Sequence, residues 1–298
     1  MRVGLVVNPT AGRARAARFH TGIRRQLQHH GHAVVDLTAF DAAGALAKAR
    51  AEVPDLDALV VVGGDGVVQL GVNAVAGTDV ALGVVPLGSG NDNATGLSLP
   101  RDPRAAVDLV VRHLEHRPAG EATDALRIET ATSTTWAMGT ASCGIDAVVN
   151  EVANRMPWPR GSLRYPLALM RVLPAYRRPR YRVEADGWSW EGHAVLVAAS
   201  NIGWFGGGMR IAPSARPDDG LIDVAIGGDI GPLPLLALVP RIYSGTHVTH
   251  PKVELRRATS VTISADVPRG VFADGEPVGE LPATVTAVPA AVRVLRPA

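Results

Sequence analysis

The stretch Val60-Val61-Val62-Gly63-Gly64-Asp65-Gly66 decides the fold of this chain. Its valines predict a buried strand, and residues 67–76, which follow, have a helical pattern. Three glycines at the junction let the backbone turn sharply and let a phosphate group approach it closely. A plain strand-to-helix turn in which Asp65 caps the helix would explain the same residues. The motif alone therefore leaves its function open.

Strands and helices alternate on both sides of that motif. Apolar strands are expected at residues 2–7, 33–38, 58–62 and 80–85, and helices at 13–30, 42–51, 67–76 and 103–113. This alternation predicts a doubly wound parallel α/β sheet with helices on both faces. After about residue 120 the segments become short, β-prone and bounded by turns, among them single strands expected at residues 134–142 and 188–199, which predicts an antiparallel β-sandwich. We therefore expect an α/β domain at residues 1–122 and a β-sandwich domain at 123–298, and leave open whether the last residues return to the first domain.

Length and composition are consistent with two globular domains. The chain has 298 residues, of which 47% are hydrophobic and 19% charged. No apolar run reaches the roughly 18 residues of a membrane-spanning helix, and no leader sequence precedes the first strand, so we expect a cytoplasmic protein. The single cysteine, Cys143, excludes an intramolecular disulfide and a cysteine-cluster metal site.

A second glycine-rich turn, residues 86–93, follows the next predicted strand. The carboxyl ends of parallel strands meet at one edge of a sheet, so the two glycine turns are expected to face the same ligand. Asn8 and Gly12 follow the first strand and are expected at that edge too. The dinucleotide fingerprint and the Walker pattern are both absent.

Far downstream, Asp274-Gly275-Glu276 places two carboxylates around a glycine after a β-prone run. Taken alone, these residues would be interpreted as an ordinary hairpin turn. A kinase, however, needs a carboxylate that accepts the proton of the substrate hydroxyl. The triplet is therefore a candidate catalytic motif only in combination with the glycine turns.

Taken together and in order, these motifs resemble the diacylglycerol kinase catalytic-domain family, which includes bacterial lipid kinases and sphingosine kinases. The matching segments are residues 8–12, 63–66, 86–92, 144–147, 206–209, 212–215, 218–224 and 274–276. They extend over nearly the whole chain. The resemblance implies an ATP-dependent lipid kinase with a nucleotide-binding α/β domain, a β-sandwich domain for the lipid, and an active site between them.

The resemblance also implies roles for individual residues. Asp274 would be the general base, and Glu276 would support it. The ATP-binding residues would be Asn8, Pro9, Gly12, Gly63, Gly64, Asp65, Gly66, Gly88, Ser89 and Asn91. Mg²⁺ would accompany ATP, and a structural Mg²⁺ site would use Asp218 or Asp219 together with the Leu221 carbonyl, although a hairpin turn explains these residues as well. One departure is Val67, where the family usually has a hydroxyl residue.

The expected partner is a lipid substrate, diacylglycerol or a related lipid. We expect no nucleic-acid partner. Residues 158–178 mix apolar and arginine residues and could either contact an anionic membrane or form a surface helix with one core face. We expect peripheral association with the inner face of the membrane, and leave a homodimer open. The alternative functions are an NAD kinase-like small-molecule kinase and a non-catalytic lipid- or nucleotide-binding regulator.

Overall fold

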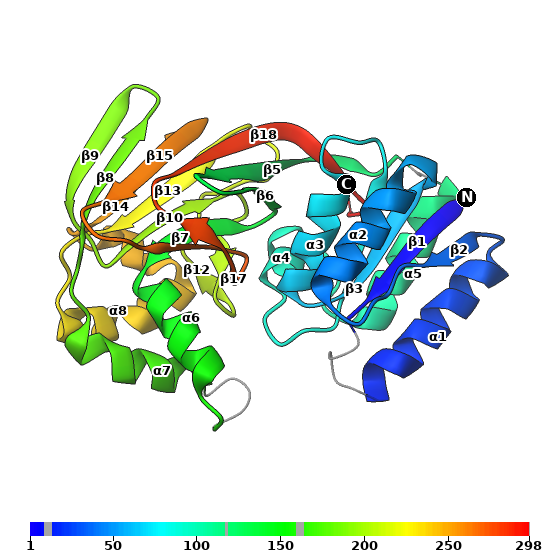
Figure 1. Cartoon of the computed structure of the whole chain (residues 1–298), viewed down its shortest axis with the longest axis horizontal. Coiled ribbons are helices and arrows are strands. Elements are labelled where there is room, and N and C mark those ends of the chain that lie inside the picture. Colours follow the sequence, from blue (N-terminus) through cyan, green and yellow to red (C-terminus); the bar gives the residue numbers. More distant parts are fainter. Residues whose placement is uncertain (9–13, 117–118, 159–163, 298) are drawn as a thin grey trace. The chain divides into compact units, whose positions relative to one another are not determined.

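The computed structural model describes residues 1–8, 14–116, 119–158 and 164–297. Contacts divide the chain into two compact units, and Figure 1 shows the elements of each. Unit 1 comprises Met1–Ala125 and Val288–Ala298, and unit 2 comprises Leu126–Ala287. The expected folding domains at residues 1–122 and 123–298 stay a prediction.

Unit 1 contains a parallel sheet. Its strands are β1 (Arg2–Val7), β2 (Ala33–Asp36), β3 (Ala58–Gly63), β4 (Ala81–Pro86) and the last residues of β18 (Ala283–Val294). They lie in the order β2-β1-β3-β4-β18, and each neighbouring pair is parallel. β3 and β4 are buried along their whole length, which fits their continuous apolar sequences.

Helices cover both faces of this sheet. They are α1 (Ala14–His29), α2 (Ala42–Glu52), η1 (Val53–Asp55), α3 (Asp65–Val75), α4 (Asp92–Gly96) and α5 (Pro103–His116). Leu27 of α1 and Val110 of α5 share an apolar cluster with Val60 of β3. The neighbouring Val61 points to the other face and meets α3, where a Cβ on Gly71 would lie 2.9 Å from its Cγ1. The predicted doubly wound α/β architecture is confirmed.

Unit 2 is built mainly from antiparallel strands. They are β5 (Glu121–Thr130), β6 (Thr134–Ala137), β7 (Thr140–Gly144), β8 (Arg180–Ala185), β9 (Trp188–His193), β10 (Leu196–Ser200), β11 (Trp204–Phe205), β12 (Met209–Arg210), β13 (Ile222–Gly227), β14 (Val253–Ala258), β15 (Ser260–Ala265), β16 (Gly270–Ala273), β17 (Glu276–Glu280) and the start of β18. One sheet has the order β14-β13-β10-β7-β16-β17, and the second contains β6, β5, β18, β15, β8 and β9. Both contribute buried residues to one apolar core. The predicted β-sandwich is confirmed.

Five helices accompany these strands in the described part of unit 2. They are α6 (Ile145–Arg155), α7 (Arg164–Val172), η3 (Leu173–Ala175), α8 (Pro232–Ser244) and η4 (Thr246–Thr249). Ile145 of α6, Leu173 of η3 and Leu238 of α8 belong to one apolar cluster, separate from the sandwich core. In Figure 1 the three α-helices are the green and yellow ribbons labelled α6, α7 and α8. Among the described residues, none of the helices is both long and apolar enough to span a bilayer.

Two predicted strands are each divided in the structure. The segment expected as one strand at residues 134–142 forms β6 and β7, and the segment expected at 188–199 forms β9 and β10. In both cases the two halves belong to different sheets. A period-two pattern does not change where a chain passes from one sheet of a sandwich to the other, so the sequence did not reveal these corners.

Candidate functional site

The first glycine turn joins β3 to α3 in unit 1. A Cβ on Gly63 would lie 2.8 Å from Cγ2 of Val67 and 3.2 Å from Cβ of Asn8. Gly64, the N-cap residue of α3, has an extended backbone. The turn therefore has no room for a side chain at Gly63, and it brings the N-terminus of α3 beside the end of β1.

The second glycine turn packs directly against the first. A Cβ on Gly88 would lie 2.5 Å from Cα of Gly64 and 3.1 Å from its nitrogen. The amide of Leu87 also donates a hydrogen bond to the carbonyl of Gly63 at 2.8 Å. The predicted convergence of the two turns at the carboxyl edge of the sheet is therefore present, and backbone touches backbone there.

Asn91 shapes the second turn through its side chain. Its backbone is left-handed (φ 58°), a conformation that asparagine tolerates better than most residues. The side-chain oxygen accepts a hydrogen bond from the amide of Gly88, and the side-chain nitrogen donates to the carbonyl of Gly88, both at 2.9 Å. The amide group of Asn91 is therefore engaged within the turn itself.

Asp65 links α3 to the start of α4. Its Oδ1 accepts a hydrogen bond from the backbone amide of Asn93 at 2.9 Å. Burial raises the pKa of the Asp65 carboxyl, while the amides of Asn93, Asp92 and Asn91 act in the opposite direction. The carboxylate thus fixes the second turn relative to the first.

A polar hollow of about 380 Å³ lies between the two turns. Its lining residues are Asn8, Gly64, Asp65, Leu87, Gly88, Ser89 and Gly90. Six of the predicted nucleotide-binding residues, Asn8, Gly64, Asp65, Gly88, Ser89 and Asn91, therefore line the hollow or shape its wall. Gly66 lies in the first turn of α3. Pro9 and Gly12 lie outside the described residues.

Asp274 lies in unit 2, in the turn between β16 and β17, and its backbone is left-handed (φ 49°). Its Oδ2 accepts a hydrogen bond from the amide of Met138 at 3.0 Å, and its Oδ1 accepts from the amides of Gly139 and Thr140, each also at 3.0 Å. Three backbone donors therefore hold the carboxylate in one orientation. Glu276, the first residue of β17, is exposed.

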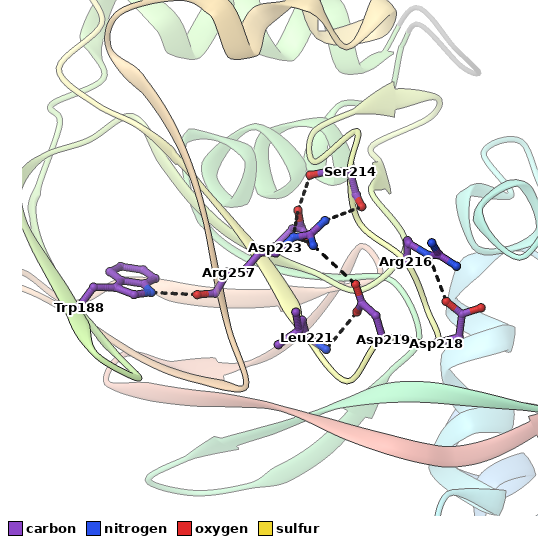
Figure 2. A network of polar contacts seen from close by, with 8 residues as sticks. All are labelled: Trp188, Ser214, Arg216, Asp218, Asp219, Leu221, Asp223 and Arg257. Carbon is purple, nitrogen blue, oxygen red and sulfur yellow. Dashed lines mark hydrogen bonds and ion pairs between the residues drawn. The ribbon is translucent and has the colours of Figure 1, made fainter.

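The predicted metal-site residues lie in the turn before β13 (Figure 2). Asp218 Oδ1 lies 3.4 Å from Nε of Arg216. Asp219 Oδ1 accepts a hydrogen bond from the amide of Leu221 at 3.1 Å, and its Oδ2 lies 3.9 Å from Nη1 of Arg257. The described residues contain no group of three or more His, Cys, Asp or Glu side chains arranged to hold a metal ion. The three residues as placed do not fit a Mg²⁺ site, because a guanidinium lies beside each carboxylate.

Unit 2 contains an apolar cavity that the sequence did not reveal. Its volume is about 120 Å³, similar to the ~150 Å³ apolar cavity that holds benzene in an engineered lysozyme. Its walls come from α6, α7, α8, η4 and the neighbouring strands, with Ile145, Leu169, Leu235, Leu238 and Ile242 among the lining residues. A space of this size and lining suits a short length of hydrocarbon chain.

Two buried polar residues, Asp146 and His247, also line this cavity. Each is only 2% exposed. Asp146 Oδ2 accepts a hydrogen bond from Ser142 at 2.5 Å, and burial raises the pKa of its carboxyl to about 6. Nε2 of His247 lies 3.1 Å from the carbonyl of Ile211 and donates to it, and burial lowers the pKa of this imidazole.

Two family models together match nearly the whole chain. The model described as diacylglycerol kinase catalytic domain matches residues 2–119. The model described as YegS C-terminal NAD kinase beta sandwich-like domain matches residues 139–296. The fold and the site thus define a kinase with an α/β catalytic domain and a β-sandwich domain.

Individual proteins that are similar to this chain are also diacylglycerol kinases. A diacylglycerol kinase of Mycobacterium tuberculosis is 38% identical over 304 residues, which are 99% of this chain and 95% of that protein. A diacylglycerol kinase of Staphylococcus carnosus is 28% identical over 95% of this chain and 90% of its own. A solved structure of a diacylglycerol kinase from Bacillus anthracis superposes with a TM-score of 0.74 at 18% identity and covers 99% of this chain and 97% of its own, which shows a common fold. The chain belongs to the diacylglycerol kinase family of lipid kinases, as its motifs predicted.

Proposed function

We propose that this lipid kinase transfers the γ-phosphoryl group of ATP to a hydroxyl of diacylglycerol or of a closely related lipid. The observation that carries the proposal is the contact between the two glycine turns, which leaves a polar hollow at the carboxyl edge of a parallel sheet. Ligands of doubly wound sheets bind at that edge. A Cβ added at Gly88 would meet the backbone of Gly64, so the contact between the two turns requires a glycine at this position.

The ATP phosphates are assigned to this hollow. The N-terminus of α3 opens onto it and offers backbone N–H groups and the positive end of a helix dipole. Ser89, exposed on the second turn, adds a hydroxyl. The Asp65 carboxylate on the wall of the hollow would hold the Mg²⁺ that accompanies the nucleotide, and this cation would neutralise phosphate charge. Asn8 lines the hollow, and the lack of a side chain at Gly63 lets the first turn lie close to Asn8 at the end of β1.

Asp274 is assigned as the general base for the lipid hydroxyl. The hydroxyl proton passes to the Asp274 carboxylate, an oxygen–phosphorus bond forms at the γ-phosphorus, and the bond to the β-phosphate oxygen breaks, so that ADP leaves. The three backbone donors from Met138, Gly139 and Thr140 hold the carboxylate in one orientation, which favours transfer in a defined geometry. Glu276 is assigned a supporting role beside the Asp274 carboxylate.

The hydrocarbon part of the substrate is assigned to the apolar cavity of unit 2. Residues such as Leu235, Leu238 and Ile242 give it an apolar wall. Its 120 Å³ are too small for two complete acyl chains, so binding either opens it further or leaves most of the lipid outside. Exposed Leu167, Met170 and Leu233 on α7 and α8 support a peripheral contact with the inner face of the membrane.

The test is a phosphorylation assay with γ-labelled ATP and a panel of lipids in mixed micelles. The panel contains diacylglycerol, monoacylglycerol, a sphingoid base and phosphatidylglycerol, with NAD as a soluble acceptor in a separate tube. We expect label to pass into diacylglycerol or one of the other lipids and to require Mg²⁺. Transfer to NAD alone would reject the lipid assignment. Binding of ATP and lipid without any transfer would favour a non-catalytic regulator.

A further inference from the structure

The turn before β13 brings negative charge together in unit 2. Asp218, Asp219 and Asp223 lie within six consecutive residues. Asp223 on β13 is only 2% exposed and lies directly opposite Arg257 of β14 in the antiparallel register. A buried carboxylate requires a cation or several hydrogen-bond donors near it. Either an ion from solution or a basic side chain can meet that requirement.

One guanidinium, that of Arg257, reaches three different parts of this turn (Figure 2). Its Nε lies 3.4 Å from both carboxylate oxygens of Asp223. Its Nη1 lies 3.9 Å from Oδ2 of Asp219, and its Nη2 donates to the carbonyl of Ser214 at 3.2 Å. Arg257 therefore connects residues 214, 219 and 223 through three separate nitrogens.

Other donors also face the Oδ1 atoms of these three carboxylates. The hydroxyl of Ser214 donates to Oδ1 of Asp223. The amide of Leu221 donates to Oδ1 of Asp219. Nε of Arg216 lies 3.4 Å from Oδ1 of Asp218. Each carboxylate of the turn is thus engaged with protein donors.

We propose that Arg257 takes the place of a divalent cation in this turn, so that the turn is held without bound metal. A metal ion would join carboxylate and carbonyl oxygens from separate residues. The planar guanidinium does the same with fixed, directional N–H donors and a permanent positive charge. A divalent cation approaching Asp219 would meet the positive charge of Arg257 and would have to displace it. The predicted metal residues Asp218, Asp219 and Leu221 are accordingly assigned to an arginine-held turn.

The first test measures thermal unfolding of the whole protein without nucleotide, in EDTA and in millimolar Mg²⁺. We expect the same Tm in both conditions. Mg²⁺ can also bind elsewhere, so the Asp219→Asn variant is measured in parallel. Any Mg²⁺-dependent rise in Tm should have the same size in the variant as in the wild type. A rise that the variant loses, or a fall of the wild-type Tm in EDTA that the variant does not show, would place a metal ion at the turn and overturn the proposal.

The second test removes the guanidinium. Arg257→Gln leaves the buried Asp223 without its cation, and we expect Tm to fall by about 5 °C. Arg257→Lys keeps the charge but loses the three-way connection, so its Tm should lie between those of Arg257→Gln and the wild type. The matched control is Arg182→Gln, which breaks an exposed ion pair with Glu184 on β8 and should change Tm by less than about 1 °C. Equal shifts in Arg257→Gln and Arg182→Gln would contradict the proposal. If Arg257→Gln does not fold, the Tm of Arg257→Lys and the Mg²⁺ response of Asp219→Asn still test the proposal.

Discussion

Gly88 illustrates how a single residue determines the site. Its backbone touches the backbone of Gly64, and a Cβ would lie 2.5 Å from Cα of that residue. No rotamer change relieves such a contact, because the position of a Cβ is fixed by its own backbone and the atom that it meets is main chain. The second glycine turn, which contains Gly88, would have to move away from the first, and the polar hollow between them would change shape. The absence of a side chain at Gly88 is therefore a structural requirement of the proposed phosphate site.

The first prediction concerns Gly88→Ala. We expect this variant to raise the KM for ATP at least about tenfold, because the added methyl group separates the two turns that are assigned to the phosphates. Steady-state kinetics with varied ATP give the value. The matched control is Gly22→Ala in α1, where an added Cβ meets nothing within 4 Å and helix propensity improves. An unchanged KM for ATP in Gly88→Ala would show that the ATP phosphates do not bind in this hollow.

The second prediction concerns Asp274. We expect Asp274→Asn to lower turnover on the order of 100-fold or more, the usual contribution of a general base. The new amide NH₂ would also face at least one backbone N–H among Met138, Gly139 and Thr140, which should cost about 1–3 kcal/mol of folding stability. Turnover must therefore be measured per folded molecule, at a temperature well below the Tm of the variant.

A control variant makes the same Asp-to-Asn change at another carboxylate of unit 2. Asp186 also accepts backbone N–H donors, those of Thr259 and Ser260, but both meet its Oδ2. The amide oxygen of Asp186→Asn can therefore still accept both donors, so this variant should lose less stability than Asp274→Asn and leave turnover unchanged. If Asp274→Asn lowers stability but its folded molecules keep normal turnover, Asp274 is an anchor for residues 138–140 and another group is the base.

At the scale of elements, helices α6 and α8 and the 3₁₀ helix η4 create a chemical environment that none of them has alone. Each contributes to the wall of one apolar cavity. Asp146, in the first turn of α6, and His247, in η4, are buried in that wall. Burial disfavours the charged form of both groups, which raises the pKa of the carboxyl and lowers the pKa of the imidazole. The packing of helices thus shifts the pKa values of two side chains that line the apolar cavity.

The third prediction follows from the pKa of Asp146, which burial raises to about 6 from an ordinary value of 3.8. Between these values the native state keeps a proton that the unfolded state has lost. The contribution of Asp146 to the free energy of unfolding is fully present below about pH 4 and is lost as pH rises to about 6. Asp146→Asn should remove this dependence and raise stability at pH 7 by up to about 3 kcal/mol, since two pH units correspond to roughly that energy.

Urea denaturation at a series of pH values from 4 to 7 measures this effect. The difference between wild type and Asp146→Asn isolates the group from the other titrating residues. Glu151→Gln, at an exposed position of the same helix, is the control and should follow the wild-type profile in parallel. A constant difference between wild type and Asp146→Asn across this range would show that Asp146 does not take up a proton on folding.

At the scale of the whole molecule, the two units have different chemical character. Unit 1 offers a polar hollow among backbone amides, and unit 2 offers an apolar cavity together with exposed apolar side chains on its helices. Leu233 on α8 is 80% exposed, and Met170 on α7 is 53% exposed. Isolated exposed apolar residues are ordinary, but several on helices that also enclose an apolar cavity favour contact with lipid.

The fourth prediction tests that contact. We expect Leu233→Ser to weaken binding to vesicles of equimolar phosphatidylcholine and phosphatidylglycerol by roughly tenfold, the value of burying one leucine side chain. Co-sedimentation with the vesicles measures it. The control is Val267→Ser, which removes an exposed apolar side chain elsewhere in unit 2 and should leave binding unchanged. If both variants bind as the wild type does, the membrane contact does not involve the exposed end of α8.

The sequence by itself determined the fold class, the family and the location of the glycine turns. These features depend on local pattern: continuous apolar strands, helix periodicity and glycines at strand ends, read along consecutive residues. Only the tertiary structure brought Asp274 to the amides of residues 138–140, more than 130 positions away, and Arg257 to the turn that was predicted to bind metal. It also assembled the apolar cavity from helices distant in sequence. Such contacts depend on which elements pack together, and the pattern of any single segment does not contain that information.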